Sequence, residues 1–152
     1  MRKSTVGVIA ALALACAHVS QPDLSKTLQL MHAPLGALTI GTQVEIASSL
    51  RNVSGGEIEV CTQEPVVSAW LEGTDHAFKW PIVLGGAILD SECATRKTLL
   101  PGDEITYVSR GGISRELPAG AATLHLSIGV SSPPRSPTVR IRSEQSVTLA
   151  AR

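Results

Sequence analysis

Apolar and polar residues alternate with a period of two over much of the chain. In the stretch VEIASSLRN, the residues Val44, Ile46 and Leu50 lie on one side of an extended backbone. In the stretch TLHLSIGV, the leucines, the isoleucine and the valine share one face, and His125 and Ser127 share the other. The same alternation recurs in the shorter runs LQL and EIEV. Because successive side chains of a strand point to opposite faces, this pattern predicts half-buried β-strands.

The strand-like runs are separated by short segments that favour turns. These segments are NVSGG, LPGDE, LPAG and SSPPRSP. Glycine supplies backbone conformations that other residues avoid, and proline and asparagine favour turns through fixed or locally hydrogen-bonded geometry. Strand patterns that recur at intervals of roughly 8 to 12 residues, with turns of this kind between them, predict an antiparallel β-sandwich. The expected fold class is therefore all-β.

The order of these features resembles that of small immunoglobulin-like sandwich domains of bacterial envelope proteins. The resemblance rests on LRNVSGG between two strands, on LLPGDEITYV, and on ELPAGAATLHLSI, and it covers most of residues 40–130. It implies an antiparallel immunoglobulin-like β-sandwich, which we expect over residues 28–152. Many unrelated functions occur on this fold, so the resemblance implies no particular activity.

The first residues of the chain predict an export signal. Arg2 and Lys3 provide a positive charge, and residues 6–15 contain only Val, Gly, Ile, Ala and Leu, as in a secretory signal peptide. This apolar run is much shorter than the roughly 20 residues that a helix needs to span a bilayer. We therefore expect a signal peptide over residues 1–15, a lipidated cysteine with a polar tether over residues 16–27, and the sandwich domain over residues 28–152.

The stretch ALAC, which ends at Cys16, resembles the lipobox of bacterial lipoproteins. In that family the cysteine thiol receives a diacylglyceryl group, and its freed amine receives an acyl chain such as palmitate. The resemblance covers only the first 16 residues and departs from the family pattern at Ala13, where leucine is usual. Ala13 and Ala15 also suit ordinary signal peptidase, which would cut just before Cys16. Both processing routes stay open at this point.

The cysteine count favours lipidation. An exported chain enters an oxidising space in which thiols tend to pair, and we expect a disulfide between Cys61 and Cys93. The odd cysteine is then Cys16, at the lipobox position. Lipidation implies a membrane anchor in the cell envelope, and Ala17 after the cysteine resembles lipoproteins that are sent to the outer membrane, facing the periplasm or the surface. Ordinary cleavage would instead give a periplasmic or secreted protein.

Charge and motifs point away from nucleic acids and from catalysis. The chain has 13 basic and 13 acidic side chains, without a basic face of the kind that nucleic acids bind. None of the common nucleophile, phosphate-binding or metal-binding motifs occurs after the signal region. Met31 beside His32 is a weak copper signal because neighbouring strand residues point to opposite faces, and Glu57 with Glu59 predicts a solvated charge stripe. We expect no enzyme, no cofactor, no metal and no small-molecule substrate.

The segment between Cys61 and Cys93 also holds three of the four aromatic residues, which are Trp70, Phe78 and Trp80. One interpretation is that they fill the core. The other is an exposed aromatic platform, because tryptophan is enriched at binding hot spots.

The function that the sequence favours is a lipid-anchored, non-catalytic binding or structural module whose envelope partner is unknown. If the strand LHLSIGV lies at a sheet edge, its polar face, which carries no charged side chain beside Ser127, is a possible partner-binding surface. The alternative is an exported protease inhibitor that presents the proline-rich loop SSPPRSPT with Arg135.

Overall fold

The computed structural model describes residues 23–61, 68–82, 84–85, 96–132 and 138–152. Within them almost all regular structure is β-strand. The elements are α1 (Leu24–Thr27), β1 (Leu28–His32), β2 (Ala37–Thr39), β3 (Gln43–Asn52), β4 (Ile58–Cys61), β5 (Ser68–Gly73), the 3-10 turn η1 (Thr74–His76), β6 (Lys79–Ile82), β7 (Leu84–Gly85), β8 (Arg96–Leu99), β9 (Glu104–Gly112), β10 (Gly120–Val130) and β11 (Val139–Ala150). No helix in these residues is long and apolar enough to cross a bilayer.

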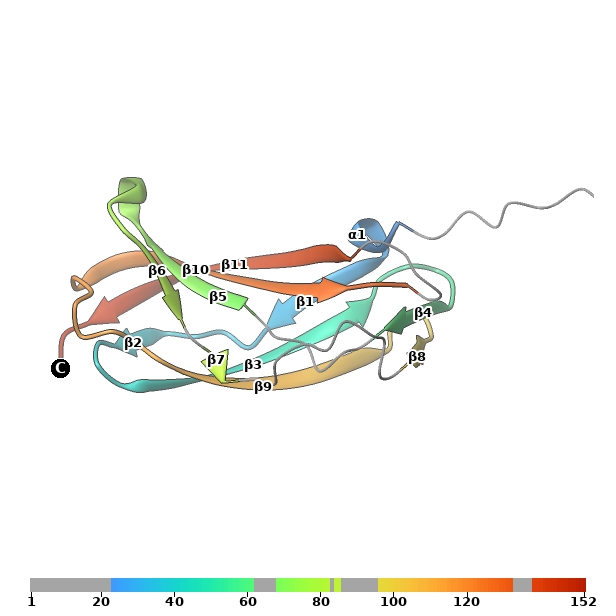
Figure 1. Ribbon diagram of the computed structural model, residues 1–152, viewed down its shortest axis with the longest axis horizontal. Helices are drawn as coiled ribbons and strands as arrows, with labels where there is room; N and C mark the ends of the chain where they lie inside the picture. Colours follow the sequence, from blue (N-terminus) through green and yellow to red (C-terminus); the bar gives the residue numbers. More distant parts are fainter. Residues whose placement is uncertain (1–22, 62–67, 83, 86–95, 133–137) are drawn as a thin grey trace, which may run out of the picture.

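The strands form two facing sheets and a small ribbon (Figure 1). One sheet has the order β1-β3-β9-β7, the other has the order β2-β11-β10-β5-β6, and β4 pairs with β8. Pairing is antiparallel except between β2 and β11, which are parallel. The chain thus passes from the edge of one sheet at β1 to the edge of the other at β2. This order matches the ABED and GFCC′ sheets of immunoglobulin domains, so the predicted all-β, immunoglobulin-like sandwich is confirmed.

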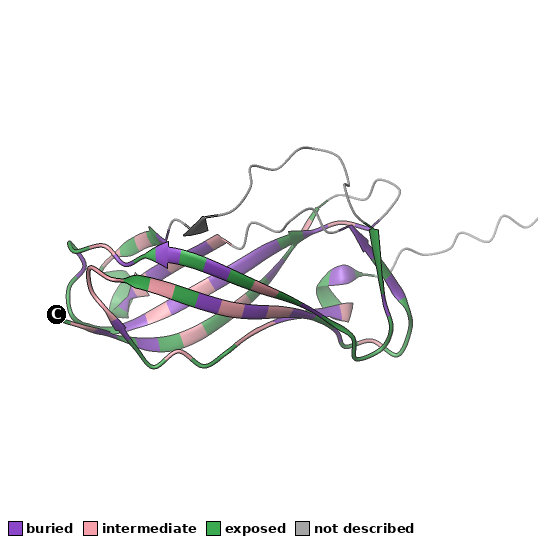
Figure 2. Ribbon diagram, turned by 90° about the horizontal axis from the view of Figure 1, so that it is seen from below, coloured by how far each residue is buried: buried purple, intermediate pink, exposed green. Residues whose placement is uncertain are grey.

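Alternating burial along the strands builds one core between the sheets, as the purple and green bands of Figure 2 show. On β3, Ile46, Ser48 and Leu50 point inward and are almost completely buried. On β10 the predicted apolar face is buried as well, at Leu124, Leu126, Ile128 and Val130. The sheet-to-sheet contact of these side chains is the main apolar burial that stabilises the fold.

The position of β10 corrects the expectation about Ser127. This strand lies inside its sheet, between β11 and β5, so its backbone groups are already paired. Ser127 is 2% exposed and lies in register with Arg142 of β11 and Ser68 of β5. The sheet edge on which Ser127 was expected to meet a partner is therefore absent, because β11 and β5 flank its strand.

The folded domain begins before residue 28. Asp23 caps α1 by accepting a hydrogen bond from the backbone N–H of Ser25, at 3.2 Å, which is the usual role of aspartate at a helix start. Leu24, placed by the sequence in the polar tether, is 3% exposed and packs into the core. The domain therefore extends through the four residues of α1.

The two ends of the sandwich differ in what they carry (Figure 1). At one end lie α1, the turn after β3 and the turn between β8 and β9, and here the backbone N–H of Val53 donates to the carbonyl of Thr27 at 2.9 Å. At the other end lie the β2–β3 turn and the C-terminus. β3 joins the ends and has 10 residues, which is a length of roughly 33 Å for a strand.

Candidate binding cleft

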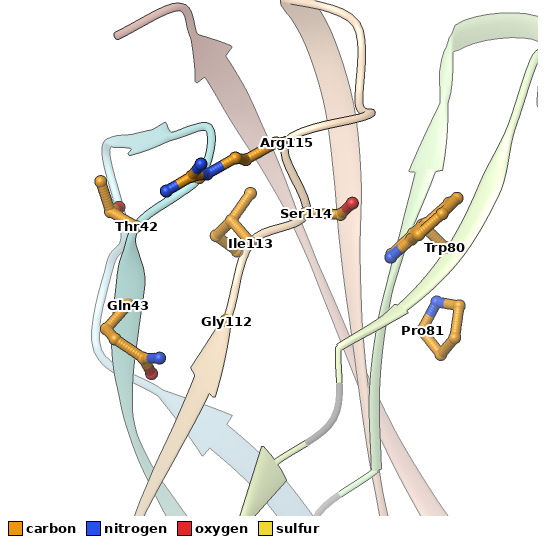
Figure 3. Close-up of a pocket in the computed structure, with 9 residues that line it drawn as sticks. Thr42, Gln43, Trp80, Pro81, Gly112, Ile113, Ser114 and Arg115 are labelled. Carbon is orange, nitrogen blue, oxygen red and sulfur yellow. The ribbon is translucent and has the colours of Figure 1, made fainter.

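A cleft of about 480 Å³ opens at the end of the sandwich that carries the C-terminus (Figure 3). Three segments that are distant in sequence form it: the β2–β3 turn with the start of β3, the residues that follow β9, and β6 of the other sheet. The lining residues are Gly41, Thr42, Gln43, Trp80, Pro81, Gly112, Ile113, Ser114 and Arg115.

Backbone hydrogen bonds fix one wall of the cleft. The N–H of Gly41 donates to the carbonyl of Ile113 at 3.0 Å, and the N–H of Ile113 donates to the carbonyl of Thr42 at 2.9 Å. The Thr42 hydroxyl closes the turn by donating to the carbonyl of Thr39 at 2.8 Å. These bonds join the β2–β3 turn to the residues at the end of β9. The two chain segments of this wall are therefore fixed to each other.

Gly41 is required at its position for two reasons. Its φ of 77° lies in the left-handed region, which glycine adopts without strain. A Cβ atom there would also lie 2.9 Å from Cγ of Arg115, whose side chain crosses directly over this glycine. The turn therefore shapes the path of the Arg115 side chain along the cleft wall.

Two polar side chains of the cleft, Arg115 and Trp80, can only donate hydrogen bonds. Figure 3 shows the Arg115 guanidinium extending toward the β2–β3 turn, with the indole nitrogen of Trp80 and the hydroxyl of Ser114 directed into the space between the two walls. Arg115 forms no ion pair with any carboxylate in the described residues. None of the lining residues is acidic. The cleft is thus suited to a ligand group that accepts hydrogen bonds and carries negative charge.

The remaining surface of the cleft is apolar. Ile113 is 4% exposed and forms the floor, while Trp80 packs partly against the core and partly lines the opposite wall with Pro81. Phe78, on the same side of the chain as Trp80, is also half-buried against the core. The core-filling interpretation holds for Phe78 and Trp80, which pack against the core, and Trp80 also lines the cleft.

Trp70 is not a lining residue of the cleft and lies on the outer face of the five-stranded sheet, in register with Pro81 of β6. The Trp70 ring stacks on the His125 ring with centroids 4.8 Å apart and an interplanar angle of 3°. Nζ of Lys79, a residue of β6, lies 5.2 Å from the centroid of the Trp70 ring. Trp70 also lines a separate hollow of about 470 Å³ together with Ser68, Ala69, Lys79 and Pro81. Glu72 beside Trp70 is bonded to His76, and this hydrogen bond holds the pKa of the Glu72 carboxyl below its usual range.

The other candidate residues from the sequence are distributed as follows. Cys16, Cys93 and Arg135 lie outside the described residues. Cys61 ends β4 and is 5% exposed. Glu59 is on the solvated face and forms an ion pair with Arg96 at 3.7 Å. The described residues contain no group of three or more histidine, cysteine or acidic side chains placed to hold a metal ion.

Comparisons with known proteins do not identify a family. No family model matches the sequence, and no curated protein matches it significantly. Among solved structures, Escherichia coli alpha-2-macroglobulin from domain MG7 to its C-terminus is 10% identical with a TM-score of 0.46, over 84% of this chain and 17% of that chain. PapD-like domain 7 of human CEP192 is 10% identical with a TM-score of 0.36, and the match covers 99% of this chain and 97% of that chain. AggA, the major subunit of E. coli aggregative adherence fimbriae, is 13% identical with a TM-score of 0.40, and the match covers 82% of this chain and 94% of that chain. Such weak similarities say nothing about what this chain binds.

Proposed function

We propose that this protein is a non-catalytic binding module, anchored in the bacterial cell envelope through a lipid on Cys16, that takes its ligand in the cleft between Arg115 and Trp80. One observation carries the proposal. The cleft lies at the end of the sandwich opposite α1, and α1 is the element from which the chain leads back to Cys16. A domain held by its α1 end presents the cleft away from the membrane, roughly 33 Å distant along β3.

The chemistry of the cleft defines the class of ligand. Arg115 offers a planar array of donors that fits a carboxylate in a bidentate manner, and the indole N–H of Trp80 supplies another donor from the opposite wall. Trp80, Pro81 and Ile113 add apolar surface. A ligand with a carboxylate beside an apolar face, such as an acidic sugar or a peptide with an exposed carboxylate, satisfies both parts.

The lining residues support binding without covalent chemistry. They include no histidine, cysteine, aspartate or glutamate, so neither lining hydroxyl has a general base beside it within the cleft. The hydroxyl of Thr42 is already used in its turn. The hydroxyl of Ser114 accepts a hydrogen bond from the backbone N–H of Glu116 at 3.2 Å.

The test is retention of carboxylate ligands by the mature protein. On an array of carboxylated glycans and peptides paired with their neutral or amidated counterparts, the wild type should retain carboxylated members. Replacing Arg115 with glutamine should reduce their apparent affinity roughly 10- to 100-fold, because a charge-assisted hydrogen bond is lost.

Arg142→Gln is the matched control, since Arg142 is an exposed arginine of β11 outside the cleft and its loss removes the same charge. It should bind as the wild type does. Equal losses in the two variants would mean that net charge, and not the cleft, governs retention, and the proposed site would then be wrong.

A further inference from the structure

Exposed apolar side chains gather at the α1 end of the sandwich. Val53 is 49% exposed in the turn that follows β3, and Leu100 is 52% exposed directly after β8. Pro101, which follows Leu100, is exposed too. We call these three residues the apolar tip. Scattered exposed apolar residues are ordinary on protein surfaces, so the significance of the tip depends on where it lies.

Hydrogen bonds hold the parts of the tip next to one another. The N–H of Gly102 donates to the carbonyl of Asn52 at 2.9 Å, and the N–H of Asn52 donates to the carbonyl of Asp103 at 3.0 Å. These bonds join the turn that carries Val53 to the turn that carries Leu100. The N–H of Val53 in turn donates to the carbonyl of Thr27, the last residue of α1. The tip is therefore a fixed surface next to the start of the folded domain.

The turns do not need apolar side chains at these positions. Backbone groups and the side chains of Asn52 and Asp103 make the bonds that close them; for example, the N–H of Leu100 donates to Asp103 Oδ2 at 2.9 Å. The side chains of Val53 and Leu100 remain half in solvent. Their burial against something outside the domain would remove apolar surface from water, which is favourable.

Two ion pairs lie near the tip, while Asp103 in the turn of Leu100 forms no ion pair within the described residues. Lys26 lies 3.3 Å from Asp23, and Arg51 lies 3.6 Å from Glu104, measured between the charged atoms. Paired charges neither repel a lipid surface nor attract it strongly. A contact made by this end should therefore be driven by apolar side chains and should depend little on salt.

The chain length between Cys16 and the domain limits the possible partners. Cys16 precedes Asp23 by seven residues, and a fully extended segment of this length spans at most about 25 Å. With a lipid on Cys16, the α1 end would stay within that distance of the bilayer. The tether holds no protein partner close to the α1 end in the same way.

We propose that the apolar tip rests on the lipid bilayer, with Val53 and Leu100 inserted at the headgroup level. The proposal rests on the anchor proposed above. The contact orients the sandwich with the cleft facing away from the membrane, and it adds weak apolar binding to the permanent attachment through Cys16.

The experiment places an environment-sensitive fluorescent amino acid at position 53, 100 or 108 of the mature chain. Position 108 is the control because Val108 is also exposed, at 58%, but lies within β9. The mature protein is joined at its N-terminal Cys16 to phosphatidylcholine vesicles by a lipid thioester, whose thiol is released as a stable amide forms, a product that only an N-terminal cysteine gives. The attachment therefore does not depend on whether cells acylate Cys16, and a failed anchor and a failed contact are told apart.

The expected result is a blue shift at positions 53 and 100 on vesicles, with loss of emission when the lipids are brominated, and no change at position 108. The same response is expected at low and high salt. Equal emission with and without vesicles at all three positions would overturn the proposal. A blue shift of the free protein that rises with its concentration would overturn it as well, since the tip would then cover a second copy of the chain.

Discussion

Replacing Asn52 with alanine should lower the free energy of unfolding by about 3 kcal/mol, because one buried side chain that makes four hydrogen bonds is lost. Asn52 is 1% exposed. Its Nδ2 donates to the carbonyl of Gly56 at 2.8 Å and to that of Leu99 at 2.9 Å. Its Oδ1 accepts from the N–H and the hydroxyl of Ser54, at 2.9 Å and 2.7 Å. One side chain therefore ties the turn after β3 to the end of β8.

Two variants control for this effect in denaturant titrations. Asn52→Asp keeps an acceptor oxygen but sets a buried carboxylate against the carbonyls of Gly56 and Leu99, so it should destabilise the domain at least as much as Asn52→Ala. Gln29→Ala removes an exposed amide from β1 and should change the midpoint little. A loss below about 1 kcal/mol for Asn52→Ala would mean that water replaces these bonds, and Asn52 would not be the link between the turns.

Breaking the proposed disulfide between Cys61 and Cys93 should cost about 3 to 4 kcal/mol of unfolding free energy, from the loop entropy that the bond removes from the unfolded chain. What supports the pairing is position. Cys61 is 5% exposed and lies opposite Arg96 in the β4–β8 ribbon, and Cys93 precedes Arg96 by three residues. A bond here would close the ribbon at its end.

The measurement compares Cys93→Ser with the wild type, each with and without reductant. The reductant should destabilise the wild type to the level of Cys93→Ser and leave the variant unchanged. Alkylation of the mature, unreduced protein should modify neither Cys61 nor Cys93. Modification of either residue under these conditions would show that the two thiols are unpaired.

The sequence predicts the fold well because alternation is a local property. The apolar face of β10 is visible in TLHLSIGV without knowledge of any other strand, and it is buried as expected. Alternation does not say which strands pair. Ser127 was for that reason placed on a possible edge, whereas β11 and β5 flank its strand on both sides.

The cleft could not be predicted from the sequence, since its parts meet only through pairing and sheet packing. Gly41, Trp80 and Arg115 come from three separate segments, and none belongs to a recognised motif. The nearest signal is the glycine between Ile40 and Thr42, which indicates a turn. Only the backbone bonds between that turn and the end of β9 place Arg115 over it.

The sequence pattern also does not predict which polar side chains lie opposite one another between strands. Tyr107 of β9 lies opposite Ser48 of β3, and neither hydroxyl has a hydrogen-bond partner among the described residues. Burial raises the pKa of Tyr107 to about 12, so the phenol stays neutral at ordinary pH. Alternation predicts that Ser48 points inward, but it does not reveal that a second hydroxyl without a partner belongs to the residue opposite it.

The anchor is tested most directly by metabolic labelling with radioactive palmitate in a bacterial host that expresses the full chain. The wild type should incorporate label and sediment with membranes, whereas Cys16→Ser should do neither, because the only proposed acceptor of the diacylglyceryl group is gone. Labelling of both proteins, or of neither, would contradict the claim that a lipid on Cys16 holds this binding module in the envelope.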